Sequence, residues 1–163
     1  MEKKETVKYL EKQLATVGAK IYTYGGTEFI AIQNPYSDNH IAITFGEEEF
    51  QMEFTYQTAR FSYGTEDDAI LHVKKYITDK LCAVEIFLNG KPLFGGSRET
   101  ATSQFKTPEE FARFYAVGNE KIAENLLGFM ANGNVSVKIF SWSGKYDRAF
   151  EIIVDGDKLY IKE

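Results

Sequence analysis

The spacing of apolar residues predicts a helix followed by a hairpin at the start of the chain. Apolar side chains recur at helical spacing between positions 3 and 17, and Gly18 follows where a left-handed glycine often ends a helix. Two runs of alternating character, AKIYTY and TEFIAI, then flank Gly25 and Gly26, a pair typical of a two-residue hairpin turn. These residues therefore predict one helix and one antiparallel pair of strands.

Apolar residues at every second position predict three more strands after the turn-forming segment NPYSDN. Residues 41–45 and 50–56 both carry apolar side chains at alternate positions. The next apolar pair, Phe61 and Tyr63, falls on odd instead of even positions. A turn near residues 57–60 that leads into a third strand explains this change of phase.

Helix-start signals predict three further helices. Thr65 precedes three acidic residues, Thr107 and Pro108 open a capping box, and Asn119 is a favourable N-cap. Apolar residues at helical spacing follow each signal. The predicted helices cover residues 65–80, 107–118 and 119–132.

The stretch GKPLFGGS at residues 90–97 fits most of the phosphate-binding pattern G-x-x-x-x-G-K-[ST], but Gly96 replaces the lysine. A phosphate loop also leads into a helix, whereas residues 97–106 have no apolar helical stripe and predict a mobile polar loop. The Asn-Gly pair at 89–90 is a strong hairpin signal. We therefore expect a hairpin after a strand at 82–88.

The order of elements predicts a single α+β domain over residues 1–163. Three strands, at 134–142, 145–154 and 158–162, end the chain as a meander. The whole order shows no sustained strand-helix-strand alternation, which disfavours a parallel sheet. We expect about eight to ten mostly antiparallel strands, with about four helices packed on one face or at one end.

Composition supports one aromatic core that needs no metal, disulfide or other cofactor. Hydrophobic residues make up 44% of the 163 residues, with 13 Phe and 10 Tyr. The single cysteine, Cys82, cannot form an internal disulfide, and the opening MEKKETVKYL is typical of an amphipathic helix instead of a leader. We expect a cytoplasmic protein without a membrane segment.

The balance of charge disfavours nucleic-acid binding. The chain has 24 acidic and 19 basic residues, a formal charge of −5, and its basic residues are scattered. Non-specific nucleic-acid binding depends on a basic face that neutralises phosphates. A basic partner or a neutral ligand is expected instead.

Few residues are candidates for catalysis, and none is assigned a catalytic role. His40 beside Asp38 could form an acid-base pair, although an exposed histidine at a strand edge is the simpler interpretation. His72 is expected on a helix flank, and Cys82 is expected to be buried as a small hydrophobic residue. No histidine or cysteine pair has the spacing of a zinc site.

Aromatic and arginine residues are the better candidates for a binding surface. Trp142, Tyr146 and Arg148 cluster near one predicted hairpin end, and Arg60 lies among other aromatics. Such residues dominate binding hot spots when they are exposed, but at strand spacing they also form ordinary core. Both interpretations remain open from the sequence.

The sequence thus favours a non-enzymatic protein-binding domain, such as an inhibitor, an immunity protein or a chaperone. Its acidic and aromatic surface would hold a protein partner of unknown identity through Trp142, Tyr146, Arg148 and Arg60. The alternative is a small-molecule or minor enzymatic site in a concave sheet face, lined by His40, Asp38, Tyr56 and Arg60. An exposed sheet edge also offers a route to a homo-oligomer.

Overall fold

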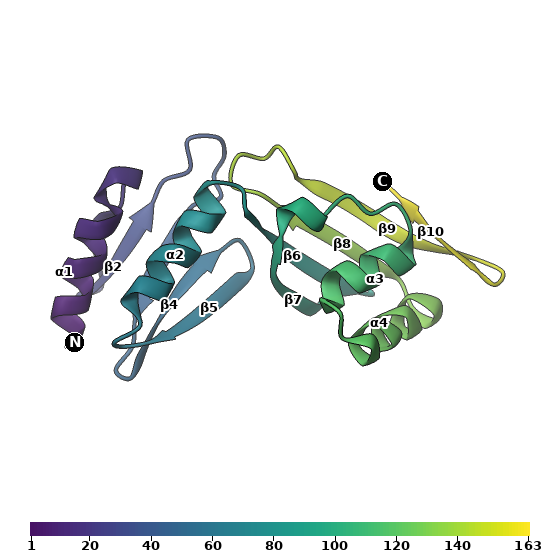
Figure 1. Cartoon of the computed structure of the whole chain (residues 1–163), viewed down its shortest axis with the longest axis horizontal. Helices are drawn as coiled ribbons and strands as arrows, with labels where there is room; N and C mark the ends of the chain where they lie inside the picture. Colours follow the sequence, from purple (N-terminus) through teal and green to yellow (C-terminus); the bar gives the residue numbers. More distant parts are fainter.

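Antiparallel pairing organises the strands into two sheets of five strands each (Figure 1). The computed structural model describes all residues, 1–163. Its helices are α1 (Lys3–Leu14), α2 (Glu66–Ile77), α3 (Pro108–Ala116) and α4 (Glu120–Asn132), with short 3-10 helices at Ala15–Val17 and Thr100–Thr102. The predicted α+β class is confirmed, and none of the helices combines the length and apolar character needed to span a membrane.

The N-terminal sheet has the strand order β1-β2-β3-β4-β5, and the C-terminal sheet has the order β10-β9-β8-β6-β7. Every strand pairing in both sheets is antiparallel. The first sheet consists of β1 (Lys20–Tyr24), β2 (Thr27–Ile32), β3 (Ile41–Phe45), β4 (Glu49–Phe54) and β5 (Gln57–Ser62). The second consists of β6 (Leu81–Leu88), β7 (Lys91–Glu99), β8 (Val135–Phe140), β9 (Arg148–Asp155) and β10 (Lys158–Lys162).

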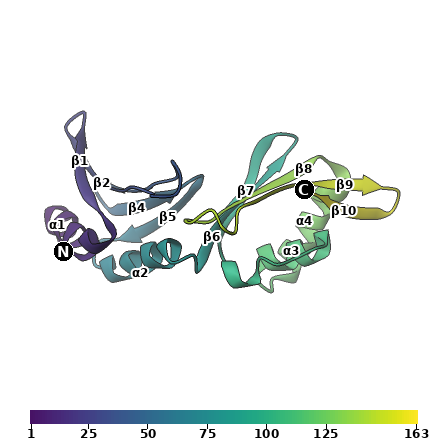
Figure 2. The ribbon, with the colours of Figure 1, turned by 90° about the horizontal axis from the view of Figure 1, so that it is seen from above.

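All four helices lie on one side of the two sheets (Figure 2). Because side chains alternate along a strand, each sheet has one face toward the helices and one face away from them. Ile30, Ile43 and Met52 are paired across neighbouring strands and buried toward α1 and α2. We call the opposite side the helix-free face.

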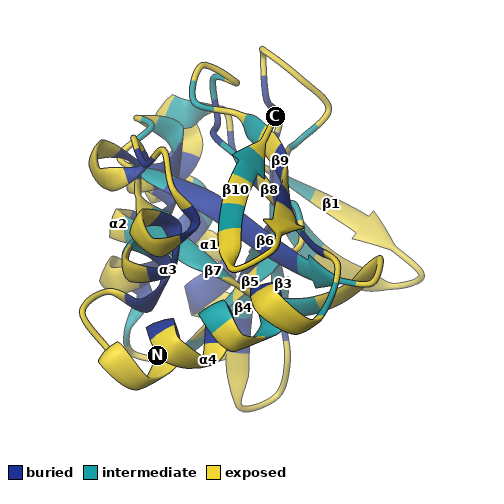
Figure 3. Cartoon of the chain, turned by 90° about the vertical axis from the view of Figure 1, so that its right-hand side faces the viewer, coloured by how far each residue is buried: buried dark blue, intermediate teal, exposed yellow.

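Two hydrophobic clusters fill the interior, so the expectation of one core is wrong. The first joins α1 and α2 to the N-terminal sheet, and the second joins α3 and α4 to the C-terminal sheet. Figure 3 shows the buried residues along the strands and the inner sides of the helices. The division follows from the two sheets, because each needs its own helices to cover its apolar face.

Capping side chains begin α3 and α4 as predicted, whereas α2 differs from the prediction. Thr107 Oγ1 accepts a hydrogen bond from the amide of Glu110 at 3.1 Å, and Asn119 Oδ1 accepts one from the amide of Ile122 at 3.2 Å. Thr65 makes no such cap to α2. Instead, the buried Glu66 carboxylate accepts hydrogen bonds from Gly64 and from Thr6 of α1, which ties the two helices together.

One turn and one loop predicted from the sequence differ from the structure. The β4–β5 turn is formed by Thr55 and Tyr56, two residues earlier than expected, because β5 already begins at Gln57. The stretch expected as a mobile loop from residue 97 continues β7 as far as Glu99. The Asn-Gly hairpin turn is confirmed, with both residues at positive φ.

The β4–β5 turn packs on the helix-free face of the C-terminal sheet and joins the two halves of the molecule. Gln57 Nε2 donates hydrogen bonds to the Glu85 carboxylate and, at 3.1 Å, to the main-chain oxygen of Val84. Tyr56 contacts the Phe87 and Phe140 rings, with centroids 6.3 and 6.2 Å away. We call this set of contacts the inter-sheet contact.

Gly95 is expected to be essential to the inter-sheet contact. A Cβ at this position would collide with Gln57 Nε2 and would lie 2.6 Å from Glu85 Oε2. Gly95→Ala should displace the Gln57 amide and leave a buried carboxylate without its donor, at a cost of roughly 1–3 kcal/mol of unfolding free energy. Urea unfolding measures this loss.

Gly128→Ala is the matched control for this substitution. Gly128 lies within α4, and an added Cβ would meet no atom within 4 Å. Because alanine is the better helix former, the control should stabilise the protein by about 0.5–1 kcal/mol. Equal effects of the two substitutions would contradict the role of Gly95.

His72 is expected to make the protein less stable in mild acid. Its ring lies between Phe61 and Tyr76, and its Nε2 is buried without a hydrogen-bond partner. Burial, with a smaller contribution from Lys75, lowers the pKa of His72 below its ordinary value. The unfolded chain therefore takes up a proton more readily, and stability should fall as pH drops through about 6.5.

His72→Phe keeps an aromatic ring at this site but removes the ionisable group. Urea unfolding between about pH 7.5 and about pH 5.5 should show a smaller loss of stability in this variant than in the wild type. His40→Phe, which removes the other histidine, controls for the loss of one such residue. A pH dependence in His72→Phe equal to that of the wild type would refute the prediction.

Candidate functional site: a pocket between the two sheets

A pocket of about 460 Å³ opens on the helix-free side where the two sheets meet. Both halves of the chain contribute to it: the segment before β3, strands β3 and β4, the β4–β5 turn, and β8. We call it the inter-sheet pocket. It is lined by Asp38, Asn39, His40, Ala42, Glu53, Thr55, Tyr56 and Phe140.

A buried asparagine holds the segment that carries Asp38 and His40. Asn34 Nδ2 donates to the main-chain oxygen of Asn39 at 3.0 Å and to that of Trp142 at 2.8 Å. These bonds fasten the segment to itself and to the connection between β8 and β9. The polar side of the pocket is therefore positioned by contacts from both halves of the chain.

Aromatic side chains form the other side of the pocket. Tyr56 is 62% exposed although its ring contacts Phe87 and Phe140, so one side of the ring faces solvent. Phe140 is half-buried on the helix-free face of β8. The two rings belong to different sheets, and the inter-sheet contact brings them together.

The polar groups of the pocket do not form an acid-base pair. His40 Nδ1 lies 3.3 Å from the main-chain oxygen of Asp38 and is not bonded to its carboxylate. Glu53 accepts a hydrogen bond from Gln51 Nε2 at 3.1 Å. The acid-base pair that His40 and Asp38 could form is thus not present, and His40 is an exposed residue just before β3, as in the simpler interpretation.

The charge of the pocket is negative. Two of its lining residues are acidic, Asp38 and Glu53, and none is a lysine or arginine. Neither carboxylate takes part in an ion pair, since the chain's two ion pairs are Arg60 with Glu49 and Arg148 with Glu163. The pocket therefore combines uncompensated negative charge with aromatic walls.

Thr55 is the strained member of the pocket. Its φ of 55° lies in the left-handed region, which is unfavourable for a β-branched residue. Its Oγ1 is buried and makes no hydrogen bond within the chain. Strain of this kind persists where the surrounding packing enforces it and often accompanies function.

The structure separates the four residues expected to bind a partner. Trp142 is 4% exposed and packs on Phe54, so it is a core residue and not a surface anchor. Arg148 points toward the helices, where it donates to the main-chain oxygen of Phe105 at 3.1 Å and bonds to Glu163. The Arg148 guanidinium is thus engaged by groups of the same chain.

The remaining two expected residues lie apart from this core. Arg60 is exposed on β5 and lies 3.7 Å from the Glu49 carboxylate. It does not line the inter-sheet pocket, whereas Asp38, His40 and Tyr56, the other residues of the alternative site, all do. Tyr146 is half-buried and lines a second pocket.

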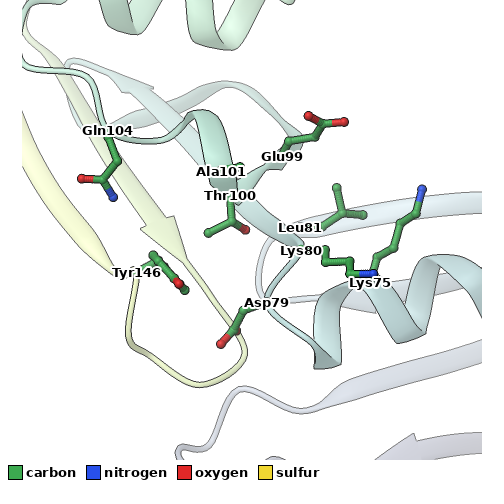
Figure 4. A pocket seen from close by; sticks show the side chains of 9 residues that line it. All are labelled: Lys75, Asp79, Lys80, Leu81, Glu99, Thr100, Ala101, Gln104 and Tyr146. Atoms are coloured by element: carbon green, nitrogen blue, oxygen red, sulfur yellow. The ribbon is translucent and has the colours of Figure 1, made fainter.

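The second pocket has a volume of about 480 Å³ and lies at the end of α2 (Figure 4). Its charged side chains are balanced, with Lys75 and Lys80 against Asp79 and Glu99. Asp79 is also used structurally, because its Oδ1 accepts a hydrogen bond from the amide of Ser143 at 3.0 Å. This balance leaves no preferred sign of charge for a ligand.

Cys82 is unsuited to nucleophilic chemistry. Its side chain is fully buried, as expected, and burial raises its thiol pKa to about 11, although the nearby Thr100 hydroxyl opposes part of this effect. The thiol is therefore protonated at neutral pH. The structure also brings together no group of three or more potential metal-ligating side chains.

Sequence reasoning missed five of the lining residues: Asn39, Ala42, Glu53, Thr55 and Phe140. Glu53 and Phe140 occupy positions on the helix-free faces of β4 and β8, as the strand pairings show. Strand alternation could identify these positions but not their proximity, because the contact between the sheets depends on tertiary structure. Comparisons with family models, curated proteins and solved structures found no match.

Thr55→Asn is expected to stabilise the protein. Asparagine tolerates positive φ better than a β-branched residue, so the substitution should raise the free energy of unfolding by about 1 kcal/mol. Urea unfolding tests the change, with Thr58→Asn as a control on the exposed face of β5. A loss of stability at position 55 would show that packing of the threonine outweighs its backbone strain.

Proposed function

We propose that the protein is a non-enzymatic binding domain that holds a basic protein partner on its helix-free face. The observation that carries this proposal is the inter-sheet pocket, which joins aromatic walls to two unpaired carboxylates in the middle of that face. The absence of an acid-base couple there is consistent with binding rather than catalysis.

Exposed aromatic residues extend the face beyond the pocket. On β1, Tyr22 is 38% and Tyr24 is 83% exposed, and the Tyr22 ring stacks on Phe29 of β2 at 5.6 Å. Strand alternation places these three side chains on the helix-free face. Tyrosine supplies large contact area at low entropic cost, so such a surface suits protein recognition.

The N-terminal sheet also gives the face an acidic character. Between residues 20 and 62, which run from its first strand to its last, the chain has six acidic residues and two basic residues, Lys20 and Arg60. That arginine is already paired with Glu49. A partner with basic groups would complement this charge and be steered toward it.

A second candidate function is the binding of a small molecule in the inter-sheet pocket. The favourable observation is that Asp38, His40 and Tyr56 line one cavity of about 460 Å³, which lies within the range of ligand sites. Such a ligand would bind without contacts to the β1 tyrosines. A partner protein would use both regions.

The proposal is tested by replacing Tyr22 and Tyr24 with serine in one variant. Tagged full-length protein is used to capture partners from its native lysate, and mass spectrometry identifies them. Loss of both tyrosines should weaken capture of a basic protein by at least about ten-fold, because exposed aromatics dominate binding energy. Raising the salt concentration should also weaken capture.

The matched control removes exposed apolar residues from the helix side. Leu71 in α2 is 54% exposed and Ile122 in α4 is 43% exposed. Leu71→Ser with Ile122→Ser should leave capture unchanged. If this control loses the partner while the tyrosine variant keeps it, binding belongs to the helices and the proposal fails.

A further inference from the structure

We infer that the inter-sheet pocket takes an arginine side chain of the protein partner. This inference rests on the proposed function, since it names the group that the helix-free face would recognise. The partner segment would lie over the N-terminal sheet and extend one guanidinium group between the aromatic walls and the carboxylates. The pocket would thereby fix the position of the partner on the face.

The electrostatic part of the inference comes from Asp38 and Glu53. Both line the pocket, no lysine or arginine does, and neither is neutralised by an ion pair. The neighbouring cation on β8, Lys138, has its ammonium group 5.7 Å from the centroid of the Phe87 ring and is not a lining residue. A positively charged ligand would therefore supply compensation that the fold does not provide.

The shape and aromatic walls favour arginine among the cationic side chains. Tyr56 and Phe140 present rings on which a planar guanidinium can stack, and carboxylates accept its fixed set of donors in parallel. A lysine ammonium lacks both the planar surface and the paired donors.

The volume of the pocket fits a side chain delivered by a peptide. At about 460 Å³ the cavity exceeds the needs of a bare guanidinium ion and leaves room for the aliphatic stem. The exposed Tyr56 lies at the pocket, and the β1 tyrosines extend the same face, so a chain leaving the pocket would meet further contact area. Binding should therefore depend on peptide flanking the arginine.

The test is an NMR titration of the ¹⁵N-labelled full chain with the peptide acetyl-Gly-Ser-Arg-Ser-Gly-amide. The arginine peptide should shift the amide signals of Asp38, Glu53 and Phe140 saturably. The same peptide with citrulline, which has the shape of arginine without its charge, should bind at least about ten-fold more weakly. Equal binding of the citrulline peptide, or no saturable shift with arginine, overturns the inference.

A charge-matched pair of variants locates the binding. Asp38→Asn with Glu53→Gln removes two negative charges inside the pocket, and Glu47→Gln with Glu48→Gln removes two in the exposed β3–β4 turn. The pocket variant should weaken the arginine peptide by about ten-fold or more, whereas the turn variant should change it less than about two-fold. Equal weakening by the two variants would show that binding depends on the net charge of the protein, and it would overturn the assignment to the pocket.

Two more ligands test whether the pocket prefers arginine to lysine and whether binding needs the flanking peptide. The lysine version of the peptide should bind several-fold more weakly, and equal binding would overturn the preference for arginine. Free N-acetylarginine amide should also bind more weakly than the peptide. If it binds as tightly, the site serves a small cation and the docking of a peptide is overturned.

The inference and the proposed function can fail separately. Capture of a basic protein that depends on Tyr22 and Tyr24, together with no binding of the arginine peptide, would refute the pocket's role but leave the face as a docking surface. Saturable arginine binding at the pocket, with no partner that depends on those tyrosines, would refute the proposed function. In that case the cation chemistry of the pocket would stand.

Discussion

The joining of the two sheets depends on a contact in which one carboxylate is buried between them. Glu85 lies on the face of β6 that points away from α3 and α4, yet it is only 7% exposed because the β4–β5 turn covers it. Burial raises its pKa, and the Gln57 amide opposes this by donating to the carboxylate. Gly95 leaves the space that both side chains occupy. Each sheet could keep its own helices without this contact, but the inter-sheet pocket would not form.

The same contact connects backbone strain to the proposed binding face. The turn that delivers Gln57 holds Thr55 at positive φ and places Tyr56 against the C-terminal sheet. Trp142 contributes from the interior, because its main-chain oxygen anchors Asn34 and with it the segment that carries Asp38 and His40. Trp142, which was predicted to contact a partner, thus helps to position the pocket from the protein interior.

Local signals predicted the elements well because each acts over a few residues. The capping residues Thr107 and Asn119 and the Asn-Gly turn at 89–90 all lie where expected. The errors occurred where local signals were weak. Ser97 and Arg98 look like loop residues, but pairing with Ala83 and Cys82 extends β7 through them. Tertiary pairing commonly overrides propensity in strands.

The sequence by itself determined the α+β class, the helices, and the two alternating faces of each strand. It also singled out Asp38, His40 and Tyr56, which the structure gathers in one pocket. Only the tertiary structure decided that there are two sheets, that Trp142 and Arg148 face inward, and that Glu53 and Phe140 join the pocket. The physical reason is that alternation separates two faces of a strand, whereas the packing of distant segments decides which face is covered.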